Sequence, residues 1–415
     1  EYLLFGRRSS AGEGIEAYED IGWDAPTIAA AVAGDSPGQR YVVDIIDTFS
    51  GSWGWTIVDD ITLTDVTLVG DYPIARGPNP EDEADDVPRD VVLSWAPGDF
   101  ADKHDVYFGA SFDDVNDADG SDPLGVLASQ GQIATTYEPD DRLDFGQTYY
   151  WRIDEVNAPP DSTIFKGDVW SFTTEPIAYP IAGERITATA SSSEPSQGPE
   201  NTVNGFGLDV NNLDLHSTEL TDMWSTTMGA PEPTWIQYEF DKVCKLHEMW
   251  VWNHNGIMEL ALGLGIKEVT IEYSVNGTDY TALGAAHEFV RAPGTTDYTP
   301  NTTVDFGGVT AKYVKLTVNG NWGGILPKYG LSEVRFFSIP VFAREPSPES
   351  GATDVDMDVT LGFRAGREAA KHDVYLSTDE QAVIDGTAPV NTVTEAGYST
   401  TLDLDSTYYW RVDEV

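Results

Sequence analysis

Two stretches of this sequence repeat at a fixed spacing, and this repeat limits the folds that the chain can adopt. PNPEDEADDVPRDVVLSW, which begins at residue 78, aligns without a gap with PSPESGATDVDMDVTLGF, which begins at residue 346. KHDVYF (103–108) and KHDVYL (371–376) keep the same offset, 346 − 78 = 268 residues, and TYYWRIDEV (148–156) matches TYYWRVDEV (407–415). A repeat of this length predicts two copies of one structural module. We therefore expect a module, a central domain and a second copy of the module.

The repeated module has the pattern of β-structure. Runs such as VVLSW (91–95), HDVYFG (104–109) and VWSFTT (169–174) are rich in β-branched and aromatic residues and are separated by turn signals. Alternation along the strand at 148–156 predicts core positions for Tyr149, Trp151 and Ile153 and solvent-facing positions for Tyr150, Arg152 and Asp154. The predicted fold class is all-β, a series of tandem β-sandwiches.

The strand at 148–156 followed by VWSFTT resembles the last two strands of fibronectin type III-like domains. The resemblance implies such sandwiches at 73–177 and 345–415, and the second would lack its last strand. Two interpretations of that end are open. Either the chain is an excerpt of a larger tandem protein, or a neighbouring molecule supplies the strand to the unpaired sheet edge.

The run VVDIIDTFSGSWGWTIVDDI (42–61) resembles the closing half of galactose-binding-like jelly rolls that accompany glycoside hydrolases. This resemblance implies that residues 1–72 are the C-terminal part of such a jelly roll. Incomplete domains are therefore expected at both ends of the chain.

The central region carries the most specific resemblance, because five motifs occur in the order of one family. They are ITATASSSEPSQGPENTVNG (186–205), MWSTT (223–227), WIQYEFDK (235–242), IKEVTIEYSVNGTDY (266–280) and the run from AKYVKLTVNGNWGG to SEVRFF (311–337). Residues 182–338 thus resemble a discoidin, or coagulation-factor C-type, domain, a family that includes many bacterial carbohydrate-binding modules. The resemblance implies an eight-stranded jelly roll whose ligands bind to loops at one end.

Charge and cysteine content exclude several classes of protein. The chain has 23 basic and 70 acidic residues, a net charge of −47, whereas nucleic acids and anionic membranes attract clustered Lys and Arg. The acidity either keeps an exposed surface soluble or binds calcium. Cys244 is the only cysteine, so no internal disulfide is possible, and its apolar surroundings predict a buried, inert thiol. No apolar run reaches the length of a membrane span, so no membrane insertion is expected.

No motif for catalysis is found. The six histidines form no H-E-x-x-H, and no nucleophile elbow, P-loop or dinucleotide-binding glycine motif occurs. Carboxylates are too numerous for a glycosidase-like pair to be informative. His104 and His372 occupy equivalent repeat positions, which the shared fold explains. We expect no enzymatic activity within these residues and no organic cofactor.

The discoidin-like resemblance implies two kinds of site. Members bind sugars with aromatic and polar residues at loop tips, and the matching candidates here are His254, Asn255, Arg291, Trp322 and Tyr329. Many also hold a structural calcium between an Asp-Gly turn and a glutamate on the last strand. This chain has Asn204-Gly205 in place of Asp-Gly, and the remaining candidate ligands are Asp209, Asn211, Asp214, Asp222 and Glu333.

The whole chain resembles tandem-module extracellular proteins of environmental bacteria, planctomycete-like in character. The first functional interpretation is a non-enzymatic extracellular structural or adhesive protein, a surface rod or filament subunit that assembles head-to-tail by strand complementation of its end domains and can contact glycans. The alternative is a set of carbohydrate-binding accessory modules of a larger secreted polysaccharide-active enzyme. A cell-surface receptor ectodomain is a third option, disfavoured by the lack of disulfides.

Overall fold

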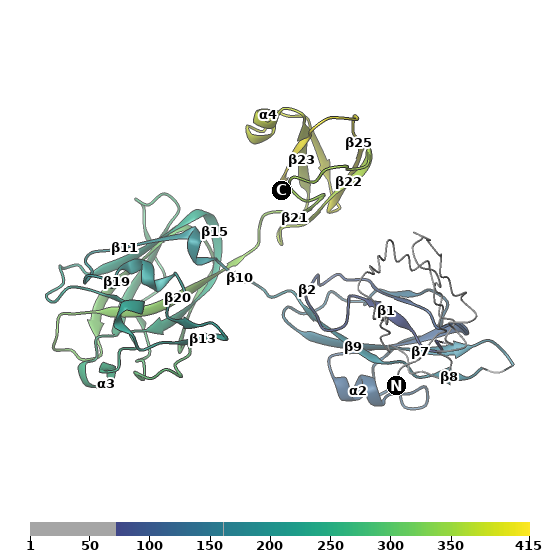
Figure 1. Cartoon of the computed structure of the whole chain (residues 1–415), viewed down its shortest axis with the longest axis horizontal. Coiled ribbons are helices and arrows are strands. Elements are labelled where there is room, and N and C mark those ends of the chain that lie inside the picture. The colour runs from purple at the N-terminus through teal and green to yellow at the C-terminus, as the bar shows by residue number, and fades with distance from the viewer. Residues whose placement is uncertain (1–71, 161) are drawn as a thin grey trace, which may run out of the picture. The chain divides into compact units, whose positions relative to one another are not determined.

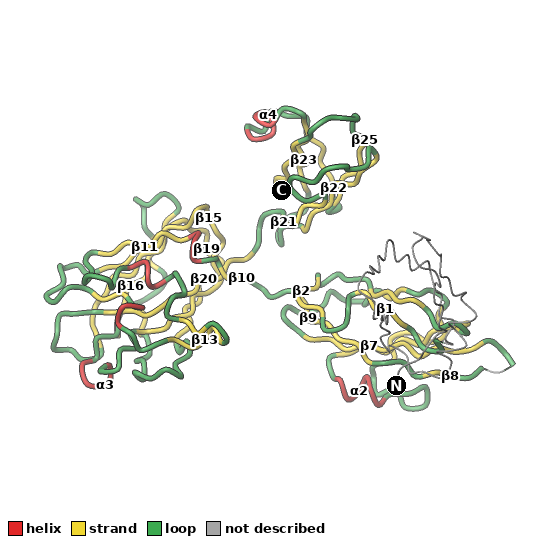
Figure 2. Tube along the Cα trace, viewed as in Figure 1, coloured by secondary structure: helices red, strands yellow, loops and turns green. Residues whose placement is uncertain are grey.

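A computed structural model describes residues 72–160 and 162–415. Backbone contacts divide the chain into two units, Glu1–Glu175 and Pro176–Val415. In both units the described residues form strands and loops with only short helices (Figure 2), so the predicted all-β class is confirmed. The partial jelly roll predicted for residues 1–72 lies outside the described residues.

The described part of the first unit contains two sheets, one ordered β1-β3-β6 and the other β2-β9-β7-β4-β5 with β8 beside β7 (Figure 1). Apolar side chains from both sheets, among them Leu93, Trp95, Trp151 and Phe172, form its buried core. The elements are β1 (Arg76–Asn79), β2 (Ala84–Val87), β3 (Leu93–Ala96), β4 (Ala101–Gly109), α2 (Phe112–Asp117), β5 (Leu127–Gln132), β6 (Thr136–Tyr137), β7 (Thr148–Asn157), β8 (Ile164–Phe165) and β9 (Val169–Thr174).

The second face of β7 is buried, so the prediction that Arg152 and Asp154 face solvent is wrong. The helix α2 packs over this face, and the Arg152 guanidinium donates hydrogen bonds of 2.8 Å to the backbone carbonyls of Asn116 and Ala118. Arg152 also forms an ion pair with Asp154, with 2.7 Å between Nε and Oδ1. Strand alternation separates two faces but does not say whether another element covers the second one.

Residues 179–339 of the second unit form a β-sandwich around one large core. Its main sheet path is β10-β20-β15-β19-β16-β17, with β11 and β14 joined to β15 and β20 and with β18 joined to β16. The strands are β10 (Tyr179–Pro180), β11 (Ile186–Ala190), β14 (Trp224–Ser225), β15 (Trp235–Asn253), β16 (Ile266–Ser274), β17 (Thr281–Ala282), β18 (His287–Glu288), β19 (Thr302–Asn321) and β20 (Gly330–Ile339). The hairpin β12 (Leu208–Asp209)–β13 (Asn212–His216), the helix α3 (Glu259–Leu262) and the 3-10 turns η1 (Gly183–Arg185), η2 (Pro199–Thr202) and η3 (Leu220–Asp222) complete it.

Two long strands build this sandwich. The first part of β15 pairs with β11 and with the end of β19, whereas its last part pairs with the start of β19 and with β20. The register shifts between Glu239 and Cys244, and bulges of this kind bend a strand. Both halves of β15 therefore face the same core, which contains Ile236, Tyr238 and Val251. The strand ends at Asn253, and the sugar-site candidates His254 and Asn255 follow directly.

The second repeat occupies residues 344–415 and reproduces contacts of the first. Its sheets are β21-β22-β25 and β24-β23-β26. The elements are β21 (Arg344–Ser347), β22 (Asp358–Arg364), β23 (His372–Ser377), α4 (Glu380–Ile384), β24 (Val390–Val393), β25 (Gly397–Thr401) and β26 (Tyr409–Glu414). In the first copy His104 Nδ1 contacts Glu155 Oε2, and in the second His372 Nδ1 contacts Glu414 Oε2. The fibronectin type III likeness and the domain boundaries remain predictions.

Candidate functional site: a polar cluster at the end of β15

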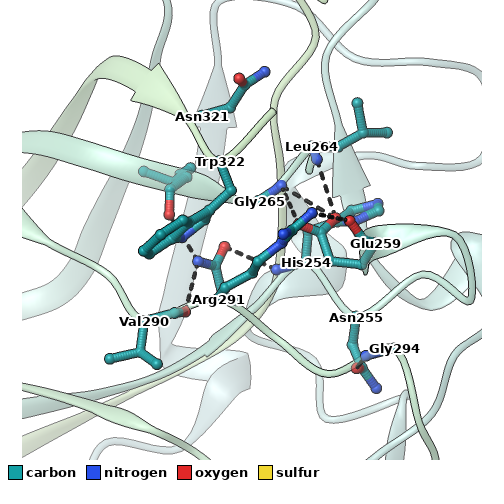
Figure 3. Close-up of polar contacts among 12 residues, drawn as sticks. His254, Asn255, Glu259, Leu264, Gly265, Val290, Arg291, Gly294, Asn321 and Trp322 are labelled. Carbon is teal, nitrogen blue, oxygen red and sulfur yellow. Dashed lines mark hydrogen bonds and ion pairs between the residues drawn. The ribbon is translucent and has the colours of Figure 1, made fainter. Parts of the chain in front are cut away.

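His254 lies directly after β15 and is buried. Its Nδ1 is 2.9 Å from Oε2 of Glu259 on α3 (Figure 3). A carboxylate only accepts hydrogen bonds, so Nδ1 is the donor in this pair, and in the neutral ring Nε2 remains as an acceptor. Within the part of the chain that the structure describes, no group is hydrogen-bonded to that buried Nε2.

Glu259 is the residue that organises the cluster, and sequence reasoning missed it. It is buried and accepts hydrogen bonds from the backbone N–H groups of Leu264 and Gly265, each 3.1 Å long. Arg291 donates from Nη2 to the backbone carbonyl of Glu259 at 2.6 Å, and its Nε lies 3.7 Å from Oε1. This Nε atom is buried and has no hydrogen-bond partner among the described residues. In the sequence Glu259 is a single acidic residue within the apolar run IMELAL, and that isolation was the available signal.

Trp322 completes the cluster from the loop after β19. Its indole Nε1 donates to the carbonyl of Phe289 at 3.0 Å, and the ring remains half-buried, with the Lys267 ammonium 5.1 Å from the ring centroid. The backbone N–H of the neighbouring Gly323 donates a hydrogen bond of 2.8 Å to the carbonyl of Gly263, just beyond α3. The structure thus brings together three of the predicted residues, His254, Arg291 and Trp322.

The other two candidates occupy different surroundings. The amide of Asn255 is fully buried and links loops, because Nδ2 donates to the carbonyls of Ser217 and Thr295 and Oδ1 accepts from the N–H of Gly294. The backbone of Tyr329 pairs with Thr226, and its ring packs against the main core. Asn255 therefore holds the Arg291 loop in position, and Tyr329 is outside the cluster around Glu259.

The calcium candidates are dispersed. Asp209 accepts the N–H groups of its own turn, Asp214 forms an ion pair with Arg335 at 3.1 Å, and Asp222 accepts from the Ser217 hydroxyl at 2.7 Å. Asn211 donates its backbone N–H to Asp209 within the turn after β12. Within the described ranges, no group of three or more His, Cys, Asp or Glu side chains is placed to hold a metal ion.

Glu333 on β20 remains a good cation ligand by its surroundings. Its carboxyl is buried and accepts one hydrogen bond from the Gly205 N–H at 3.2 Å, whereas Oε2 has no partner in the described ranges. Burial raises the pKa of Glu333 to about 8. A buried carboxyl with a free oxygen beside the turn at Asn204 fits a bound cation, because a positive charge would restore the ionised form.

Residues 187–328 match the F5/8 type C domain, and no curated protein matches the chain. Among the described residues, no helix has both the length and the apolar character needed to cross a membrane.

Solved structures of carbohydrate-binding modules from Clostridium perfringens are also similar to this chain. The third CBM32 of a family 31 glycoside hydrolase is 17% identical and is aligned over 39% of this chain and 95% of its own, with a TM-score of 0.30. The family 32 module of NanJ, solved with galactose, is 18% identical over 39% of this chain and 100% of its own, with a TM-score of 0.29. CpGH89CBM32-5, solved with GalNAc-β-1,3-galactose, is 17% identical over 39% and 100%, with a TM-score of 0.30. Residues 187–328 of this chain are an F5/8 type C domain.

Proposed function

We propose that this chain provides non-catalytic carbohydrate-binding accessory modules of a larger secreted, polysaccharide-active protein. The F5/8 type C match supports this interpretation over the filament subunit, because the family includes carbohydrate-binding modules whereas nothing in the described residues indicates head-to-tail assembly. The secreted location and the link to a polysaccharide-active protein belong to the same proposal.

The observation that supports it most directly is the cluster around Glu259. A sugar ring presents hydroxyl groups at its edge and C–H groups on its face, and binding sites combine a few polar groups with an aromatic surface. The Arg291 side chain is 29% exposed and the half-buried Trp322 ring lies in the same cluster, so both can meet a ligand from solvent, while the buried His254 supports them through Glu259. The Arg291 guanidinium is fixed by Glu259, so its remaining donors need little further ordering on binding.

A glycan array probed with the full chain tests this function. We expect binding to a set of related glycans, and we expect Arg291→Ala and Trp322→Ala to weaken it at least about tenfold, the scale of one or two lost ligand contacts. Arg185→Ala is the matched control, since Arg185 pairs with Asp241 outside the cluster. Trp322→Phe keeps an aromatic ring but loses the hydrogen bond to the Phe289 carbonyl. Comparing it with Trp322→Ala therefore separates the contribution of the aromatic surface to binding from that of the hydrogen bond that anchors the loop.

Two results would refute this proposal. One is a correctly folded chain that binds no glycan on the array. The other is binding that survives Arg291→Ala and Trp322→Ala at the affinity of the unmodified chain. Circular dichroism and thermal unfolding of each variant distinguish a lost contact from a lost fold.

We further propose that Glu333 and the turn at Asn204-Gly205 hold a calcium ion that stabilises the domain. The unpartnered, buried Oε2 of Glu333 supports this proposal. Bound calcium would supply positive charge to that carboxyl, and the protein's own part is to keep Glu333 against the Gly205 N–H. The test is given below, at the scale of single residues.

A further inference from the structure

The segment at 256–265, which contains α3, has inverted polarity. Glu259 is its only charged residue, in a chain in which 22% of residues are charged, and this glutamate is buried. The large apolar side chains of the segment point to solvent instead: Ile257, Met258, Leu260 and Leu262 are between 40% and 77% exposed. A buried charge and an exposed apolar patch are the two departures from normal burial that carry information about function.

The fold holds the segment in this orientation. Glu259 accepts hydrogen bonds from Leu264, Gly265 and His254, so a rotation that buried the apolar side chains would remove the carboxylate from its partners. Leaving a buried carboxylate unpaired is costly. The exposed apolar residues are therefore a fixed feature of the surface.

Further exposed apolar side chains extend this surface. The hydrogen bond from Gly323 to Gly263 fixes the following loop beside α3, and Ile325 in that loop is 88% exposed. Leu220 Cδ2 lies close to Gly256, at the other end of the segment. We call this set the apolar rim: Leu220, Ile257, Met258, Leu260, Leu262 and Ile325.

The apolar rim borders the candidate sugar site. The Arg291 guanidinium donates a hydrogen bond to the backbone carbonyl of Glu259 in α3. Trp322 directly precedes Gly323 in the chain, and Gly323 is hydrogen-bonded to Gly263 beside α3. A ligand whose sugar contacts Arg291 and Trp322 would therefore meet apolar side chains next to it.

We propose that this site takes a sugar that carries an apolar substituent, an alkyl or acyl chain, with the sugar at Arg291 and Trp322 and the substituent over the apolar rim. The inference rests on the proposed glycan-binding function and names the class of ligand. A net charge of −47 disfavours an anionic lipid surface as the alternative occupant.

Paired glycosides test the inference on the full chain. Methyl and hexyl β-glycosides of galactose, N-acetylgalactosamine and mannose are titrated by isothermal calorimetry below the micelle concentration of the hexyl forms. We expect the hexyl form of a bound sugar to bind about tenfold tighter or more, since each buried methylene contributes up to about fourfold. Ile257→Ser combined with Leu260→Ser should remove this gain and leave the affinity for the methyl glycoside unchanged.

Exposed apolar residues elsewhere provide the control. Ile133 and Leu404, 79% and 75% exposed, lie outside residues 182–338, and Ile133→Ser and Leu404→Ser should leave the hexyl gain intact. All these side chains are on the surface, so the variants are expected to fold, and thermal unfolding checks this.

The outcomes separate this inference from the function on which it rests. Arg291-dependent binding of a methyl glycoside without a hexyl gain, or with a gain that survives the double variant, overturns the inference and leaves glycan binding standing. No binding of any glycoside in this set or on the array overturns both. Three further results would also overturn the inference, because each assigns the apolar rim to another occupant. They are binding of hexanol alone as tight as that of the hexyl glycoside, binding to phosphatidylcholine vesicles without sugar, and dimerisation that the double variant abolishes.

Discussion

Glu333 shows how one buried side chain links the stability of this domain to pH. Its pKa is raised to about 8 because the carboxyl is buried, and among the described residues it accepts a hydrogen bond only from Gly205. When the unfolded chain exposes it, its pKa returns to the ordinary value of 4.5. Between these values the folded state keeps a proton that the unfolded state has lost. The free energy of unfolding therefore falls as the pH rises through this range.

Replacing this carboxyl by an amide should remove the effect. In the absence of divalent cations we expect Glu333→Gln to match the unmodified chain near pH 5 and to exceed its stability near pH 8 by about 1–3 kcal/mol, the cost of a poorly solvated buried group. Calcium should raise the melting temperature of the unmodified chain near pH 8 but not that of Glu333→Gln. Differential scanning calorimetry measures both effects.

The control for this experiment is Glu288→Gln, at an exposed position on β18. Identical pH profiles for Glu333→Gln and the unmodified chain would contradict the burial argument. If calcium raised the melting temperatures of the unmodified chain and of Glu333→Gln equally, any bound calcium would lie elsewhere.

At the scale of elements, an arginine clamp joins a helix to a strand in both repeats. Arg152 on β7 donates to carbonyls at the end of α2, and Arg411 on β26 donates to the carbonyls of Val383 and Ile384 in α4 at 2.8 and 2.6 Å. Each arginine also pairs with the aspartate two residues later on its own strand. The first clamp is fully buried, whereas the side chain of Arg411 is 33% exposed.

This difference in burial predicts different costs for the same substitution. Arg152→Met leaves the buried Asp154 without its ion-pair partner and should destabilise β7 by about 3–5 kcal/mol. Arg411→Met breaks a partly solvated pair and should cost about 1 kcal/mol or less. Hydrogen exchange of the β7 and β26 amides in the full chain reports each effect locally. Equal losses of protection in the two strands would show that burial does not set the cost.

Burial also raises the pKa of Asp154, an effect that Arg152 partly opposes. Removing the arginine should raise this pKa further, so the loss of protection in Arg152→Met should shrink as the pH falls and Asp154 becomes neutral. A loss that stays constant with pH would point to lost packing rather than lost charge pairing.

At the scale of the whole molecule, the charge of −47 should disfavour the association of acidic glycans before any contact forms. Like charges repel over about 30 Å at 0.01 M salt but over only about 8 Å at 0.15 M. We expect an acidic polysaccharide to associate more slowly than its methyl ester at low salt, and we expect the difference to narrow as salt is added. Biolayer interferometry with a polyuronate and its methyl ester, which share one backbone, measures this. A salt-independent ratio of association rates would contradict a role for net charge.

The sequence alone was enough for the all-β class and for the F5/8 type C region, because both depend on local patterns. The repeat at an offset of 268 also indicated equivalent positions, and His104 and His372 do make the same contact with Glu155 and Glu414. The discoidin-like resemblance implied the sugar-site candidates His254, Asn255, Arg291, Trp322 and Tyr329. The fold brings His254, Arg291 and Trp322 into one cluster, and their role in binding stays a prediction.

Only the tertiary structure decided which polar residues are buried. Alternation along β7 could not reveal that α2 covers Arg152, because a strand pattern describes two faces and not what packs on them. The role of Glu259 was hidden as well. Its partners His254, Leu264 and Gly265 are five or six residues away and match no helix or strand period, and its contact with Arg291 spans 32 residues. Burial of a charged group depends on such long-range partners, and these are absent from any local pattern.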